Sequence, residues 1–168
     1  MEIQVIEALL VEDSKLAFTI VSDMLKKSKK YTFNVKIANS LKEAEELLLE
    51  NFFHVTLLDL NLPDSLGLDT LKTVHTKFKN MPIIVLTSID EDANWFNAIT
   101  LGAQDYLIKG KFDTDLLELS IRYSLEKKKA DDRLRVTYRA LNVRSQYNKA
   151  LSVLTEEQDL LHEMCRII

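Results

Sequence analysis

The amino-acid sequence predicts an α/β fold, a doubly wound parallel sheet of five strands with a C-terminal helical extension. Apolar runs alternate with amphipathic stretches over the first 125 residues, as in a parallel sheet whose strands are joined by crossover helices. Several of these runs are apolar throughout, which is typical of strands buried on both faces. After Gly110 no further Gly or Pro occurs, and helix formers dominate to Ile168.

Strands are expected at about residues 7–11, 33–38, 54–59, 82–86 and 105–108. The second should lie at an edge, because it alternates between apolar and polar residues. Helices are expected at about residues 15–27, 41–51, 66–79, 91–101 and from 114 onward. Ser40 and Glu43 have the spacing of a capping box at the second helix. Asp90 is expected to cap the fourth helix, and Gly102 to end it.

Three carboxylates follow two of the expected buried strands. Glu12 and Asp13 come directly after the first strand, and Asp59 closes the third. The carboxyl ends of parallel strands meet at one edge of the sheet, where ligands bind. Carboxylates crowded there repel one another unless a cation lies among them. Oxygen ligands without clustered Cys or His suit Mg²⁺.

Two further polar residues end neighbouring strands. Thr87 follows the strand at 82–86, and Lys109 follows the strand at 105–108. An acid pair, an aspartate, a hydroxyl and a lysine are therefore expected at the same edge. Together they predict a magnesium-dependent phosphoryl site.

The sequence resembles the receiver domain of two-component response regulators, the CheY-like family. The matching residues are 10–14 (LVEDS), 58–64 (LDLNLPD) with Gly67, 86–88 (LTS) and 102–109 (GAQDYLIK). The resemblance covers about residues 5–125. It implies the flavodoxin-like strand order 2-1-3-4-5.

By this resemblance, Asp59 is the phosphoacceptor and takes its phosphoryl group from a phosphohistidine of a sensor histidine kinase or a phosphotransfer protein. Asp13 and Asp59 would bind Mg²⁺ directly, Glu12 through a water, and Asn61 through its backbone carbonyl. Lys109 would pair with a phosphoryl oxygen, and with Asp59 before phosphorylation.

The resemblance also implies a switch, in which Thr87 donates its hydroxyl to the phosphoryl group and the Tyr106 ring follows it inward. One departure from the family is Gly110, where proline usually follows the lysine through a bond that is often cis. Without proline a cis bond is rare, so the state of the Lys109–Gly110 bond stays open.

Composition narrows the function classes. The 46% apolar fraction fits a globular core, without a run long enough to span a membrane. The N-terminus has no signal-peptide pattern, and the single Cys165 favours a reducing cytoplasm. Residues 1–126, the expected receiver domain, carry a net charge of −7 and residues 127–168 one of +3. An acidic domain is a poor nucleic-acid binder.

Residues 127–168 are expected to form a linker helix or the start of a following domain. A heptad seam is formed by Tyr147, Leu151, Leu154, Leu161, Cys165 and Ile168. A second seam, at Leu134, Tyr138 and Leu141, is out of register with it. The apolar C-terminus resembles the opening helix of GAF sensory domains. We expect a multidomain sensor or hybrid kinase as the parent, with a homodimer through this helix.

Two other function classes stay open. Haloacid-dehalogenase-like phosphatases also use an aspartate at a strand end, but they require Asp-x-Asp where this chain has Asp59 and Asn61. A pseudo-receiver would serve assembly alone, and the complete site argues against it. The expected module is no enzyme beyond its own phosphorylation and dephosphorylation. The isolated His54 and His75 are expected at the surface.

Overall fold

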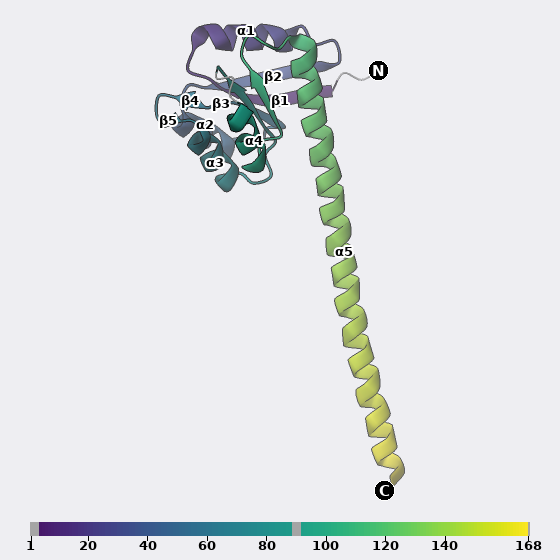
Figure 1. Ribbon diagram of the computed structural model, residues 1–168. Helices are drawn as coiled ribbons and strands as arrows, with labels where there is room; N and C mark the ends of the chain where they lie inside the picture. Colours follow the sequence, from purple (N-terminus) through teal and green to yellow (C-terminus); the bar gives the residue numbers. More distant parts are fainter. Residues whose placement is uncertain (1–3, 89–91, 168) are drawn as a thin grey trace. The chain divides into compact units, whose positions relative to one another are not determined.

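The computed structural model describes residues 4–88 and 92–167. Its backbone divides into two units, Met1–Lys128 and Lys129–Ile168, both drawn in Figure 1. Among the described residues, no helix combines the length and the apolar character that a membrane crossing requires.

The first unit is built on a five-stranded parallel sheet with the order β2-β1-β3-β6-β7. Its strands are β1 (Gln4–Val11), β2 (Tyr31–Ala38), β3 (Val55–Asp59), β6 (Ile83–Thr87) and β7 (Asp105–Ile108). This arrangement confirms the predicted fold class and strand order. Every position of β3 and of β6 is buried, because these central strands are covered on both faces.

Two helical layers cover the sheet. The helices are α1 (Lys15–Lys26), α2 (Leu41–Glu50), α3 (Leu68–Lys77), α4 (Asp92–Thr100) and α5 (Thr114–Ile167). Alternate residues of β1 enter different cores, since successive strand side chains point to opposite faces. Leu9 packs with residues of α2, α3 and α4, whereas Leu10 packs with residues of α1 and the start of α5.

The helix ends follow the sequence signals. Ser40 caps α2, and its hydroxyl accepts the Glu43 N–H at 3.1 Å. The Glu43 carboxylate accepts the N–H of Asn39 at 2.7 Å, one residue before the position that a capping box predicts. Gly102 ends α4 with φ +108°, and the Ala103 N–H donates to the Ala98 carbonyl as in a Schellman motif. Asp90 lies outside the described residues.

One element was not predicted. Residues 61–66 form a small antiparallel hairpin of β4 (Asn61–Leu62) and β5 (Ser65–Leu66). Strands this short have no readable periodicity. Because β5 uses residues 65 and 66, α3 begins at Leu68 and not at residue 66 as expected.

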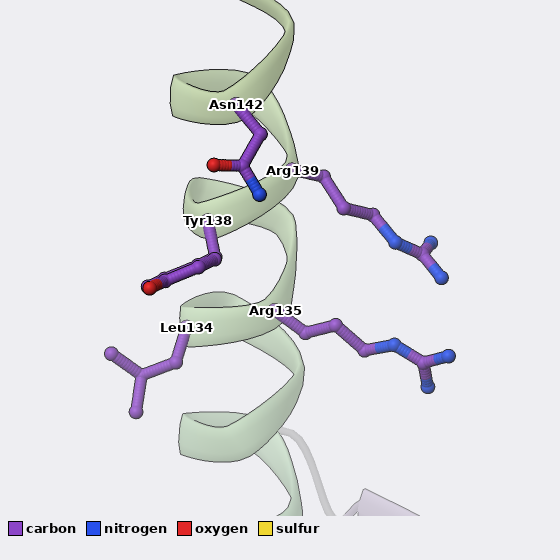
Figure 2. A pocket seen from close by; sticks show the side chains of 5 residues that line it. All are labelled: Leu134, Arg135, Tyr138, Arg139 and Asn142. Atoms are coloured by element: carbon purple, nitrogen blue, oxygen red, sulfur yellow. The ribbon is translucent and has the colours of Figure 1, made fainter. Parts of the chain in front are cut away.

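The second unit is helical throughout its described part. Figure 2 shows Leu134 and Tyr138 on one side of α5 and Arg135 and Arg139 on the other, with Asn142 in front of the helix. These five residues line a shallow groove of about 350 Å³. Leu134 and Tyr138 are exposed. The side chains of the seam beyond Tyr147 lie outside the described part.

Candidate functional site

Three carboxylates converge where β1 and β3 end. The ligand oxygens of Glu12, Asp13 and Asp59 all lie within 4.8 Å of one another. The register pairs Val11 with Leu58, so the residues that follow these two are neighbours. Glu12 is 1% exposed and Asp59 is 5% exposed, whereas Asp13 is exposed. Two of the three carboxylates are therefore buried, and the third faces solvent.

Lys109 joins this cluster from the end of β7. Its Nζ lies 2.7 Å from Oδ2 of Asp59 and 2.5 Å from Oε2 of Glu12. Its backbone N–H donates to the Thr87 carbonyl at 2.7 Å, which fixes the start of the lysine side chain beside the end of β6. The pairing of Lys109 with Asp59 was expected, and the contact with Glu12 was not.

Burial and charge set the protonation of this cluster. Burial raises the pKa of Glu12, and the nearby charge of Asp59 raises it further, while Lys109 opposes both. For Lys109, burial alone would lower the pKa, but the hydrogen bonds and charges of Asp59 and Glu12 outweigh it and raise the pKa. The lysine therefore stays cationic, because it is the counter-charge of two buried acids.

Thr87 and Tyr106 lie on the same face of the sheet. The register pairs Val85 with Tyr106 and Thr87 with Ile108, and residues two apart in a strand share a face. Thr87 is 1% exposed and Tyr106 is 8% exposed. Tyr106 belongs to the same apolar core as Ala98 of α4, so its side chain is in an inward position.

The hairpin β4–β5 holds Asn61 next to Asp59. The Asn61 N–H donates to Oδ1 of Asp59 at 3.2 Å. At the hairpin's tip, the Asp64 carboxylate accepts the N–H groups of Leu41 and Lys42 at 2.8 and 2.9 Å. At its base, the buried Thr70 hydroxyl donates to the Leu60 carbonyl at 3.1 Å.

Asp64 belongs to the matching motif at residues 58–64, but the sequence predicted no role for it. The contact of Thr70 with the base of the hairpin was not predicted either. The turn pair at 63–64 marked the tip of the hairpin. Nothing local to Thr70 indicates its contact with Leu60.

The residue after the lysine has a backbone conformation that favours glycine. Gly110 has φ +82°, and no peptide bond among residues 4–88 and 92–167 is cis. The Lys109–Gly110 bond is therefore trans. Proline is fixed near φ −65°, so the proline usual in the resembled family would not fit this loop.

The donor set fits a hard divalent cation. Its side-chain ligands are carboxylate oxygens, which suit Mg²⁺ and leave it room for waters. His54 and His75 do not contribute to this site. Both are half-buried. His54 Nδ1 accepts the Glu7 N–H at 3.0 Å, and the His75 ring lies against Gly102.

Comparison with known proteins gives a consistent result. The family model for the response regulator receiver domain matches residues 8–122. The transcriptional regulatory protein CrdR of Helicobacter pylori is 35% identical over 114 residues, which is 67% of this chain and 52% of CrdR. The transcriptional regulatory protein ZraR of Escherichia coli is 30% identical over 120 residues, 71% of this chain and 26% of ZraR. The chain thus spans about a quarter to a half of these curated relatives.

Solved structures show the same fold. A CheY-like receiver domain protein of Methanospirillum hungatei is 26% identical with a TM-score of 0.64, covering 76% of this chain and 99% of that one. The Mn²⁺-bound form of the response regulator Rcp1 is 27% identical with a TM-score of 0.57, covering 69% of this chain and 89% of that one.

Proposed function

Because this chain belongs to the response regulator receiver domain family, we propose that it is the phosphoacceptor module of a two-component phosphorelay, with Asp59 as the acceptor. The observation that carries this proposal is the convergence of three carboxylates with one lysine. A lone aspartate at a strand end would need neither the neighbouring acids nor the counter-charge.

Glu12, Asp13, Asp59 and the backbone carbonyl of Asn61 would hold Mg²⁺. When bound, the ion would neutralise the carboxylates and the oxygens of the incoming phosphoryl group. The Mn²⁺ of the Rcp1 structure supports a divalent cation in this family, since Mn²⁺ and Mg²⁺ both favour oxygen ligands.

In the proposed transfer, a carboxylate oxygen of Asp59 attacks the phosphorus of a phosphohistidine. The new O–P bond forms as the N–P bond breaks, and the imidazole keeps the electron pair. Lys109 exchanges its contact with Asp59 for one with a phosphoryl oxygen, since a flexible ammonium is a movable point charge. The step depends mainly on positioning and on charge neutralisation.

The output of the module would pass through Thr87 and Tyr106. The Thr87 hydroxyl would donate to a phosphoryl oxygen and draw this end of β6 toward Asp59. Tyr106 shares its face of the sheet and lies in the same apolar core as Ala98 of α4. A local charge event would thereby alter the surface formed by α4 and β7.

Partners follow from the same chemistry. The phosphoryl donor would be a sensor histidine kinase or a phosphotransfer protein, and the receiver would act on a downstream domain of the parent. The relatives CrdR and ZraR are transcriptional regulators by name and extend beyond the matched part. For this chain we propose a receiver of residues 1–126, joined by a helical linker to a domain of a multidomain sensor or hybrid kinase.

Acetyl phosphate as the donor tests the acceptor function. Incubation with Mg²⁺ should add the mass of one phosphoryl group to the intact protein, as acetate leaves. The same incubation with EDTA, or of the Asp59→Asn variant with Mg²⁺, should add nothing. A wild-type protein that gains no mass in any condition would overturn the proposal.

A further inference from the structure

The hairpin that follows Asp59 is anchored to two helices. Asn61 stands at its base and pairs with Leu66, while Asp64 stands at its tip. The tip is held to the N-terminus of α2 by two hydrogen bonds from backbone N–H groups, those of Leu41 and Lys42. The base is held to α3 by the Thr70 hydroxyl.

The Asp64 anchor and the Thr70 anchor are each favoured by their surroundings. The first N–H groups of a helix have no partner within the helix, and the Asp64 carboxylate supplies two acceptors to α2 from 22 and 23 residues away in sequence. These bonds lower the pKa of Asp64. The Thr70 hydroxyl, fully buried, also lies 2.8 Å from the Ser65 hydroxyl, so α3 contacts both the residue before β4 and the first residue of β5.

We propose that Asp64 is a positioning residue for the cation site, because it fixes the hairpin that holds Asn61, whose carbonyl is an expected cation ligand, beside Asp59. This inference rests on the proposed function. Asp64 itself touches neither the cation nor the phosphoryl group. It acts through the hairpin, whose opposite end carries Asn61, the residue with the expected ligand carbonyl.

The opposite wall of the site contrasts with this anchored hairpin. Lys109 is followed by Gly110, whose absent Cβ would meet nothing within 4 Å. The position of a side chain at Gly110 is therefore open, whereas the loop after β3 is held by side chains at both ends. We therefore expect cation affinity to depend on the anchored hairpin.

Mg²⁺ titration calorimetry on the full chain tests the proposal. Asp64→Asn keeps one carbonyl acceptor but loses the second, and it should bind Mg²⁺ about tenfold more weakly, the lower end of the effect known for outer partners of metal ligands. Asp69→Asn removes the same charge from the first turn of α3, where the side chain is exposed, and should bind as the wild type does.

Urea unfolding and amide hydrogen exchange separate positioning from general stability. In Asp64→Asn, exchange at the Asn61 N–H should accelerate along with exchange at Leu41. Unchanged Mg²⁺ affinity in a folded Asp64→Asn variant would overturn the inference, as would equal weakening in Asp69→Asn. If the wild type binds no Mg²⁺, the proposed function fails, and unchanged exchange at Asn61 would then overturn the anchoring role as well.

Discussion

Nζ of Lys109 lies 2.7 Å from Oδ2 of Asp59, across the edge where β3 and β7 end. The same ammonium lies 2.5 Å from Oε2 of Glu12. One lysine thus balances two buried acids, and the carboxylate proposed as acceptor is fixed by the group proposed to follow the phosphoryl oxygens.

Lys109→Met should destabilise the fold. At pH 7 we expect the free energy of unfolding to fall by about 1–3 kcal/mol, because two buried acids lose a charged hydrogen-bond donor. The loss should shrink as the pH falls through the raised pKa of Glu12, since a protonated Glu12 needs no counter-charge. Urea unfolding at several pH values measures both effects.

The matched control is Lys72→Met, which removes an exposed charge from α3. In the wild type, the raised pKa of Lys109 means that its contribution is complete below the ordinary value of 10.5 and is lost as the pH rises through the folded value. A Lys109→Met variant as stable as Lys72→Met would contradict this account of the ion pair.

Two glycines should respond differently to alanine. At Gly110, with φ +82° and nothing within 4 Å of an added Cβ, alanine should cost about 1–2 kcal/mol from backbone strain alone. At Gly102, with φ +108°, the added Cβ would lie 2.4 Å from the His75 ring. Gly102→Ala should therefore cost more, and adding His75→Ala should restore part of the loss, as measured by urea unfolding.

A double mutant that is no more stable than Gly102→Ala would show that strain, and not the His75 contact, dominates there. His75→Ala in the wild-type background supplies the reference for this comparison.

Acid should weaken the anchor of the hairpin. The N–H groups of Lys42 and Leu41 lower the pKa of Asp64 below its ordinary 3.8. Its contribution to stability is present above that value and is lost as the pH falls through the folded pKa. The difference in stability between wild type and Asp64→Asn should thus narrow as the pH falls below about 3.8. A constant difference would show that the carboxylate charge does not matter.

The helical extension should dimerise the protein. Leu134, Tyr138 and Leu141 are exposed on α5. A heptad seam, out of register with these residues, follows from Tyr147 to Ile168 and would be buried best against a copy of itself. Light scattering should give a dimer for the full chain and a monomer for a chain ending near Glu126. If both chains are monomers, the prediction of a dimerising helix is wrong.

The sheet could be predicted because its signals are local. Uniformly apolar runs identified β3 and β6, and the polar residues at their ends, Asp59 and Thr87, indicated one shared edge. The early start of β1 could not be predicted, since Gln4 belongs to the strand through its pairing with Tyr31. Pairing, and not apolar pattern, fixes that end.

The candidate site also has a part that the sequence predicts and a part that only the structure shows. The carboxylates and Lys109 could be placed at one edge from topology alone. The contact of Lys109 with Glu12 and the cap of Asp64 on α2 could not, because each joins side chains to distant residues through tertiary packing. Gly110 was recognised as a departure, but its φ of +82° became evident from the structure.

The central claim is that Asp59 accepts a phosphoryl group in a site that needs a divalent cation. Borohydride reduction after treatment with acetyl phosphate and Mg²⁺ converts an aspartyl phosphate into homoserine, which peptide mapping locates. We predict homoserine at position 59 with Mg²⁺ and none with EDTA. Homoserine at position 13, or at position 59 to the same extent in EDTA, would contradict the account.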